Sequence, residues 1–366
     1  MKKILCFIGG LGLGGAQRQI IGLASLLNKK GYETCLIAYH KDNFYADLLS
    51  KEGIRNVVVE NSGSRLSKLK AIKQFTKKEN FDVIIAYTNG PNVIGCFLKF
   101  FNRKIKLIVS DRFTRQKVGR RERILYNLYR MADCIVPNAY SQEEYIKTNF
   151  PFLAKKTVTI TNFTDTSFFS PSPDFTSVGN RKDNSRINIL VAGRISESKN
   201  ILTFLDAIHI LKERKTNIHV DWFGDVTYGM EGYKDKIQKK CSDLQIGDII
   251  NFHAGTNNIL KEYRSCDVFC LPSIREGFPN TICEAMSCGK PILCSRICDN
   301  PNIVEEGING LLFDPLSAED IANIIERYTL ISVEERQTMG RNNREKALNM
   351  FSEEAFINKY IHLIEK

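Results

Sequence analysis

Short apolar runs recur along the first 160 residues, and longer segments with one apolar face separate them. Runs that are apolar throughout are typical of strands buried on both faces of a sheet, whereas the separating segments, such as 17–29 and 66–78, have the spacing of amphipathic helices. Strands that alternate with helices predict a parallel sheet covered on both faces. The predicted strands are residues 3–8, 34–39, 57–59, 83–86, 107–109 and 134–137.

A polar segment rich in Ser, Pro, Asp and Asn interrupts this alternation, and a second series follows it. The second series has predicted strands at 187–192, 219–223, 249–252, 268–271 and 291–294, with helices at 318–328, 333–350 and 353–365. The pattern predicts an α/β protein with two tandem Rossmann-like, doubly wound domains. The predicted organisation is a first domain at 1–165, a linker at 166–186, a second domain at 187–350, and a C-terminal helix at 351–366 that packs back across the domain junction.

Length and composition agree with this organisation. The 366 residues exceed one ordinary core, and 43% hydrophobic with 25% charged residues is typical of folded proteins. The apolar runs are far shorter than the roughly 20 residues that span a bilayer, and the N-terminal run ends in glycines, which favours a first strand over a signal peptide. The eleven cysteines include no Cys-x-x-Cys pair, which indicates free thiols in a reducing, cytoplasmic compartment.

Positive charge is concentrated in the first half of the chain. The formal net charge is +11, but residues 1–160 hold 28 Lys and Arg against 12 Asp and Glu, while the remainder holds 24 against 29. The basic residues cluster at 99–106 and 112–123, where aromatic side chains stand among them. Such a surface suits an anionic membrane, here the inner face of the plasma membrane, or a nucleic acid; an ordinary solvated basic face is the third interpretation.

A glycine-rich stretch, residues 10–15, lies between the first predicted strand and the first predicted helix. Backbone N–H groups at a helix start favour phosphate. The stretch matches the dinucleotide pattern G-x-G-x-x-G, but the second strand ends in Tyr39-His40-Lys41 with Asp42 only beyond it, where a dinucleotide site needs an acidic residue. A nicotinamide cofactor and a purely structural tight turn therefore remain alternatives to a phosphate-binding loop.

Two glutamates follow the predicted strand at 268–271. Glu276 lies in the predicted loop and Glu284 in the helix after it, at the carboxyl edge of a parallel sheet, where open α/β folds bind ligands. Both can accept hydrogen bonds from sugar hydroxyls, which contribute roughly 1.5–3 kcal/mol each when one partner is charged. The alternative for either is a solvated helix face.

The sequence around these glutamates resembles a known family. Glu276-Gly277-Phe278-Pro279-Asn280, with Glu284-Ala285-Met286 and Gly289-Lys290-Pro291, is similar to the E-x7-E signature of the retaining GT4 glycosyltransferases, which adopt the GT-B fold of two domains facing each other across a cleft. The similarity covers nearly the whole chain. Further matching pieces are Gly14-Gly15-Ala16, Asn162, Asp165, Gly193-Arg194-Ile195, Lys199-Asn200 and Phe223-Gly224-Asp225.

This resemblance implies a role for each matched residue. Glu284 is expected to hold the donor ribose, Glu276 to contact the transferred sugar, and Arg194 with Lys199 to hold the diphosphate. Glu276, Arg194 and Lys199 are the expected catalytic residues. A departing nucleoside diphosphate develops negative charge, which independently requires such cations. The other expected donor-binding residues are Gly14, Gly15, Gly193, Gly277, Phe278, Pro279, Asn280 and Thr281.

The departures from the family pattern concern the first domain. Gln17 stands where family members commonly have Glu, and Ser110-Asp111-Arg112 stands where many have a histidine. We therefore predict that Asp111 and Arg112 bind the acceptor near the reacting centre, with Asp111 a further catalytic candidate. Neither half contains an Asp-x-Asp pattern, so we predict transfer without a metal or other cofactor.

The predicted function is retaining transfer of a hexose or N-acetylhexosamine from a UDP-sugar to a lipid-linked saccharide in surface polysaccharide biosynthesis. UDP-galactose, UDP-N-acetylgalactosamine and UDP-N-acetylglucosamine are the favoured donors, because the Glu-Gly-Phe-Pro-Asn variant resembles enzymes that use them. The alternatives are a sugar-nucleotide epimerase of the same fold, a dehydrogenase, and a nucleic-acid-binding protein, for which no recognised aromatic platform is present.

Overall fold

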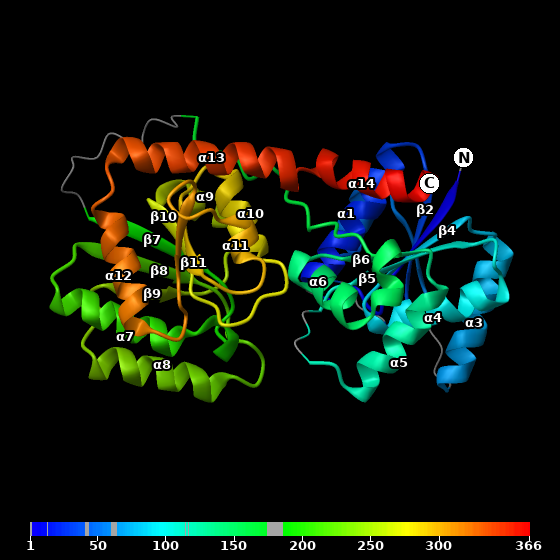
Figure 1. Cartoon of the computed structure of the whole chain (residues 1–366), viewed down its shortest axis with the longest axis horizontal. Helices are drawn as coiled ribbons and strands as arrows, with labels where there is room; N and C mark the ends of the chain where they lie inside the picture. The colour runs from blue at the N-terminus through cyan, green and yellow to red at the C-terminus, as the bar shows by residue number, and fades with distance from the viewer. Residues whose placement is uncertain are drawn as a thin grey trace. The chain divides into compact units, whose positions relative to one another are not determined.

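The computed structural model describes residues 2–12, 14–40, 44–59, 64–113, 115, 117–173 and 186–366. The chain forms two compact units (Figure 1). Unit 1 comprises Met1–Phe163 and Glu353–Lys366, and unit 2 comprises Thr164–Ser352. Most of the predicted linker, residues 174–185, lies outside the described residues.

Unit 1 is a six-stranded parallel sheet in the order β3-β2-β1-β4-β5-β6. Its strands are β1 Lys3–Phe7, β2 Glu33–Ala38, β3 Arg55–Val58, β4 Val83–Tyr87, β5 Lys106–Asp111 and β6 Cys134–Pro137. The helices of this unit are α1 Gly15–Lys29, α2 Ala46–Lys51, α3 Arg65–Glu79, α4 Asn89–Phe101, α5 Arg120–Leu128, α6 Tyr140–Asn149 and α14 Glu353–Glu365, with short 3-10 helices η1 Tyr129–Met131 and η2 Pro151–Lys156.

Both faces of this sheet are buried. Along β1, Ile4 and Cys6 belong to one apolar cluster while Leu5 and Phe7 belong to another. Successive side chains of a strand point to opposite faces, so a strand that is apolar at every position needs helices on both sides. The predicted parallel sheet with two covered faces is confirmed for unit 1.

Unit 2 repeats the architecture with the order β12-β11-β10-β7-β8-β9, also parallel throughout. Its strands are β7 Ile187–Ala192, β8 Ile218–Phe223, β9 Ile250–His253, β10 Val268–Leu271, β11 Ile292–Ser295 and β12 Gly310–Phe313. The helices are α7 Ile201–Glu213, α8 Glu231–Asp243, α9 Ile259–Ser265, α10 Asn280–Ser287, α11 Asn300–Ile303, α12 Ala318–Thr329 and α13 Val333–Phe351, with a 3-10 turn η4 Glu197–Lys199.

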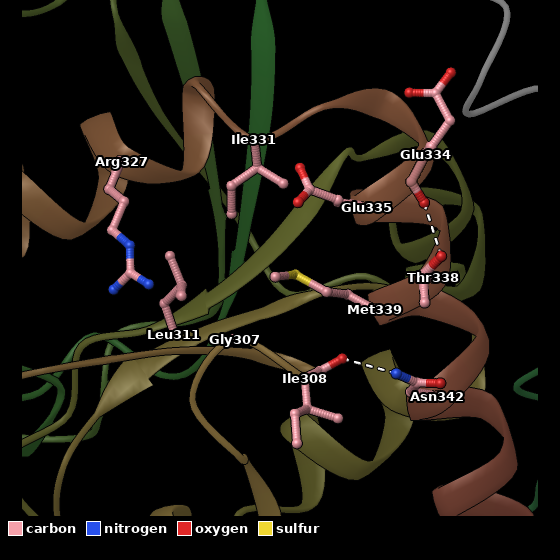
Figure 2. Close-up of a pocket in the computed structure, with 10 residues that line it drawn as sticks. All are labelled: Gly307, Ile308, Leu311, Arg327, Ile331, Glu334, Glu335, Thr338, Met339 and Asn342. Carbon is pink, nitrogen blue, oxygen red and sulfur yellow. Dashed lines mark hydrogen bonds between the residues drawn. The ribbon is translucent and has the colours of Figure 1, made fainter.

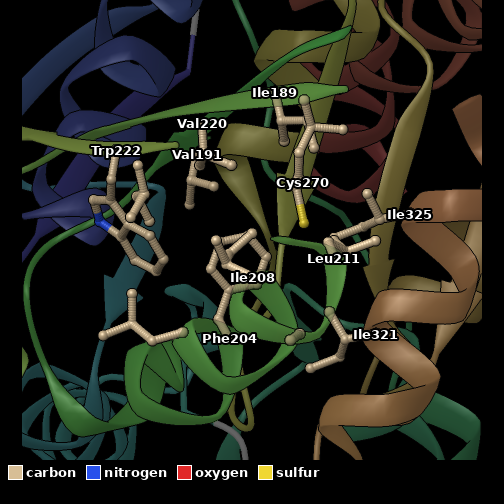
Figure 3. Close-up of a cluster of buried hydrophobic side chains, with 14 of the residues drawn as sticks. Ile189, Val191, Phe204, Ile208, Leu211, Val220, Trp222, Cys270, Ile321 and Ile325 are labelled. Atoms are coloured by element: carbon tan, nitrogen blue, oxygen red, sulfur yellow. The ribbon is translucent and has the colours of Figure 1, made fainter. Parts of the chain in front are cut away.

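The core of unit 2 is centred on the strands β7, β8 and β10 (Figure 3). Trp222 of β8 is fully buried and lies edge-on to Phe204 of α7, with ring centroids 5.9 Å apart. Such large aromatic side chains contribute much of the burial that stabilises a domain. This core packs around β7 and β10, and the candidate site lies at the carboxyl ends of these two strands.

In each sheet, the order in which successive strands are added reverses at one pair of neighbouring strands. From β1 the order runs through β2 and β3 on one side and through β4, β5 and β6 on the other; β7 and β10 form the corresponding pair in unit 2. Doubly wound sheets bind ligands beyond the carboxyl ends of the strands at this reversal. The reversal points thus indicate where to look for function.

Two general properties bear on the predictions made above. Within the described part of the chain, no helix combines the length and apolar content needed to cross a bilayer. All eleven cysteines are free thiols, and most of them are buried.

Candidate active site

The carboxyl ends of β7 and β10, at the reversal point of unit 2, carry the predicted donor-binding residues of that unit, whereas Gly14 and Gly15 belong to unit 1. Gly193 and Arg194 follow β7, and Lys199 ends the turn η4. Glu276 lies in the loop after β10, and Glu284 lies inside α10, which this loop leads into. Two stretches about 80 residues apart in sequence thus meet at one edge of the sheet.

Lys199 and Glu276 form an ion pair at this edge. The Lys199 Nζ atom lies 2.6 Å from Glu276 Oε1, and the two side chains are 19% and 13% exposed. The backbone N–H of Ile274 donates to the carbonyl of Ser198 over 2.9 Å, so the two loops are also joined through their backbones. An ammonium and a carboxylate are therefore held at adjacent positions, where one can meet a phosphate and the other a sugar hydroxyl.

Glu284 is held by a tyrosine that sequence reasoning did not identify. The hydroxyl of Tyr263, a residue of α9, donates to Glu284 Oε2 over 3.0 Å. Burial, and then the Glu284 carboxylate, raise the pKa of Tyr263 well above its ordinary value, so the phenol stays a neutral donor. Glu284 itself is 8% exposed. Its carboxylate is thus fixed in orientation before any ligand binds.

A close approach of two backbones shapes the turn after β7. A Cβ atom at Gly224, which follows β8, would lie 2.0 Å from the carbonyl oxygen of Gly193. The same carbonyl accepts a hydrogen bond of 2.9 Å from Trp222 Nε1. Only glycine at position 224 allows this contact, and the buried indole fixes the direction of the Gly193 carbonyl.

Replacing Gly224 with alanine should weaken UDP binding on the order of tenfold, because the turn that carries Arg194 has to move away from β8. Titration calorimetry with UDP measures this directly. Gly232→Ala is the control, since a Cβ at Gly232 meets no atom within 4 Å. Equal UDP affinity in the two variants would mean that the turn after β7 does not contact the donor.

The remaining predicted donor residues of unit 2 lie in the same two segments of the chain. Arg194 is exposed, and Asn280 and Thr281 are the first residues of α10. Pro279 precedes α10, and Phe278 is buried against Phe351 with ring centroids 5.7 Å apart. Gly277, like Glu276, is half-buried in the same loop. The roles assigned to these residues stay predictions.

The predicted phosphate loop of unit 1 lies at that unit's own reversal point. Gly14 immediately precedes α1, and Gly15 is its first residue. A Cβ at Gly14 would lie 2.3 Å from Gln17 Oε1. The Gln17 side chain, which is the departure from the family pattern, therefore lies close to the Gly14 backbone, at the turn where the helix begins.

Asp111 and Arg112 are tied into unit 1 by many contacts. Asp111, the last residue of β5, is fully buried, and its Oδ2 atom lies 2.5 Å from Arg115 Nη1 and accepts a hydrogen bond of 2.5 Å from the Tyr126 hydroxyl. The Arg112 guanidinium lies 3.9 Å from the centre of the Tyr87 ring and donates to Asn162 Oδ1 over 2.5 Å. The predicted acceptor contacts of both residues stay predictions.

Two hollows in unit 2 lie outside the residues that the sequence singled out as the site. One, of about 220 Å³, is beside the carboxyl ends of β8 and β9 and includes Gly224, Asp225 and His253. The other, of about 520 Å³, lies between the start of β12 and the helices α12 and α13 (Figure 2). Its wall includes Ile308, whose carbonyl accepts a hydrogen bond from Asn342. None of the predicted donor residues lines this second hollow.

The described residues contain no group of three His, Cys, Asp or Glu side chains that could hold a metal ion. The predicted reaction without a metal stays a prediction.

Comparison with protein families gives two matches that follow the two halves of the chain. Residues 13–168 match the family described as "Glycosyltransferase Family 4". Residues 174–346 match the family described as "Glycosyl transferases group 1". The E-x7-E segment lies in the second match and the glycine turn before α1 begins the first.

Relatives and solved structures agree with these matches. The chain is 25% identical over 360 residues to the lipopolysaccharide core biosynthesis glycosyltransferase LpsE of Rhizobium meliloti, with 96% of each chain covered. It is 24% identical over 317 residues, with 81% of each covered, to the N-acetylgalactosamine-N,N'-diacetylbacillosaminyl-diphospho-undecaprenol 4-alpha-N-acetylgalactosaminyltransferase of Campylobacter jejuni.

Among solved structures, HepE of Anabaena in complex with UDP and glucose superimposes with a TM-score of 0.83 at 21% identity, with both chains fully covered. This likeness concerns the fold, and the fold is GT-B. Because each half of the chain matches its family and each forms a six-stranded parallel sheet, the chain belongs to the GT4, group 1 glycosyltransferases and is an enzyme of that class.

Proposed function

We propose that this glycosyltransferase moves a hexose or N-acetylhexosamine from a UDP-sugar to a lipid-linked saccharide in surface polysaccharide biosynthesis, with retention of anomeric configuration. The observation that carries the donor half of the proposal is the placement of Lys199, Glu276 and Glu284 at one sheet edge, with Lys199 Nζ 2.6 Å from Glu276. Retention is inferred from the family resemblance.

The chemistry of these three side chains fits a nucleoside diphosphate sugar. Lys199 and the exposed Arg194 supply fixed positive charge for the diphosphate that departs, and developing negative charge is where such cations lower the barrier most. Glu284, held by Tyr263, offers carboxylate oxygens to the ribose hydroxyls. Glu276 takes the transferred sugar, for which charge-assisted hydrogen bonds contribute roughly 1.5–3 kcal/mol each.

The relatives support the proposed substrates. The Campylobacter enzyme acts, by its name, on a saccharide attached to diphospho-undecaprenol, and the Rhizobium enzyme makes lipopolysaccharide core. HepE was solved with UDP and glucose bound. We therefore infer a UDP-sugar donor and a lipid-linked acceptor for this chain, with galactose, N-acetylgalactosamine and N-acetylglucosamine as the favoured sugars.

On the acceptor side, we propose that Asp111 positions Arg115. The Arg115 Nη1 atom lies 2.5 Å from Asp111, while Nη2 donates over 2.8 Å to the exposed Asn89 at the start of α4. The guanidinium is thus held at the carboxyl edge of β4 and β5. A cation fixed at that edge suits the phosphate of a lipid-linked acceptor.

We also propose that the enzyme works in the cytoplasm, attached to the inner face of the plasma membrane. The support is the concentration of Lys and Arg in the first 160 residues, because juxtamembrane cations contribute about 1 kcal/mol each near an anionic surface. The proposed attachment is peripheral and should therefore be reversed by salt.

Saturation-transfer NMR with UDP-galactose, UDP-N-acetylgalactosamine, UDP-N-acetylglucosamine, UDP-glucose, GDP-mannose and NAD tests the donor half. We expect binding of one UDP-sugar, lost in Glu284→Ala. Binding of NAD alone, or of none of these by folded protein, would overturn the proposal. Conversion of the bound UDP-sugar to an isomer without any acceptor would instead identify an epimerase.

A further inference from the structure

Six lysines line a hollow of about 590 Å³ in unit 1. They come from three segments that are far apart in sequence: the passage from α4 into β5, the turn η2, and the last residues of the chain. Asp133 is the one carboxylate side chain among the lining residues. His362 also lines the hollow. The lysines are Lys99, Lys104, Lys106, Lys155, Lys156 and Lys366.

This lysine hollow lies at the edge of the sheet opposite to the proposed acceptor residues. Lys106 is the first residue of β5, and Asp111 is the last. Five residue steps of about 3.3 Å separate them along the strand, or about 17 Å. The hollow is therefore distinct from the candidate active site, and its charge needs another explanation.

Part of the charge in the hollow is not neutralised by the protein. Lys99 Nζ lies 2.8 Å from Asp133, and Lys156 donates to the carbonyls of Arg130 and Ala132. For the side chains of Lys104, Lys155 and Lys366, the described residues provide no hydrogen bond or ion pair. All three are exposed. Three exposed ammonium groups around one hollow are chemically suited to phosphate.

Exposed aromatic rings belong to two of the segments that carry these lysines. Phe100 and Phe101, which directly follow Lys99, are 58% and 59% exposed, and Phe152, in η2, is 45% exposed. Lys73 Nζ lies 3.4 Å from the Phe101 ring centre, and the Arg130 guanidinium lies 4.1 Å from that of Phe152. Rings and cations side by side suit a bilayer interface, whereas inorganic phosphate or pyrophosphate would give exposed phenyl rings no contact.

We propose that the lysine hollow binds the phosphodiester headgroups of an anionic bilayer while Phe100, Phe101 and Phe152 enter the interface. The proposal rests on the proposed function, because it names the surface by which the enzyme meets the membrane that carries its acceptor. It directs the amino edge of the sheet of unit 1 toward the lipid. The basic segment 112–123, at the other edge, is left for the acceptor.

The test is sedimentation of the full-length protein with phosphatidylglycerol-containing vesicles and with vesicles of phosphatidylcholine alone. The variant Lys104→Gln/Lys155→Gln/Lys366→Gln should bind the anionic vesicles on the order of 100-fold more weakly than wild type, at about fivefold per cation. The control, Lys215→Gln/Lys236→Gln/Lys261→Gln, removes three exposed lysines from unit 2 and should bind like wild type.

Several outcomes would overturn the proposal. An equal loss in both triple variants would mean that net charge alone drives binding, and equal binding to both kinds of vesicle would remove the role of the headgroup charge.

Wild-type protein that binds inorganic pyrophosphate in this hollow but no vesicles would have a site for a soluble anion. UDP binding, followed by NMR in every variant, should be unchanged; its loss in the first triple variant would show that the hollow is not separate from the donor site. Wild-type protein that binds vesicles but no UDP-sugar would contradict the proposed function and leave the bilayer surface standing.

Discussion

Glu276→Gln should lower sugar transfer on the order of 100-fold while UDP binds about fivefold more tightly than to wild type. Transfer falls because the amide replaces a charged hydrogen bond to the donor sugar. UDP affinity rises because Lys199 loses the carboxylate 2.6 Å from its Nζ atom and is free to bind the diphosphate. Steady-state kinetics with the UDP-sugar and calorimetry with UDP give the two numbers separately.

The matched control is Glu197→Gln. Glu197 is an exposed carboxylate in the same turn as Lys199, and its loss changes the net charge by the same amount. It should leave both transfer and UDP affinity unchanged. If Glu276→Gln weakened UDP binding instead of strengthening it, Glu276 would bind the nucleotide rather than the sugar, and the assignment of the two glutamates would be wrong.

Glu284→Ala should weaken UDP binding on the order of 100-fold. Two charge-assisted hydrogen bonds to ribose hydroxyls are lost, at roughly 1.5 kcal/mol or more each. The substitution also removes one of the two acceptors of the buried Tyr263 hydroxyl, and the other, the Thr281 carbonyl 3.3 Å away, remains, so the cost is about 1 kcal/mol of folding free energy. Calorimetry with UDP measures the affinity, and thermal unfolding measures the stability.

Tyr263→Phe separates these two effects, because it removes the hydroxyl that holds Glu284 while keeping both the carboxylate and the buried ring. UDP binding should fall by about tenfold, the effect of losing the orientation of Glu284 rather than the group itself. Wild-type affinity in Glu284→Ala, measured on folded protein, would remove Glu284 from the donor site.

The strands and the general fold could be predicted from the sequence because hydrophobic periodicity is a local signal. Buried parallel strands are mostly apolar runs, and each of the eleven predicted strands overlaps an observed one, as at 187–192, which is β7. β12 was missed. Gly310 and Leu311 begin it within a short stretch that follows a turn, and its pairing with β11 supplies the stability that its own pattern does not indicate.

The family and the positions of Glu276 and Glu284 could also be predicted from the sequence. The two carboxylates lie in one loop and the helix that directly follows it, so their spacing is a local pattern. The arrangement around them did not. Tyr263 reaches Glu284 from another helix, and Lys199 reaches Glu276 from a segment 77 residues away. Such contacts depend on how β7 and β10 pair, and neither segment carries a local sign of its partner.

The distribution of charge shows most clearly which features the sequence predicts and which depend on tertiary contacts. An excess of Lys and Arg in the first half is visible by counting, and it predicts an anionic partner. The hollow itself requires Lys104, Lys155 and Lys366 to come together. Lys104 lies in a turn before β5, Lys155 lies in η2, and Lys366 follows α14. A chain determines its own local pattern of apolar and charged residues, but packing of distant elements brings selected charges to one place, and that is a property of the tertiary structure alone.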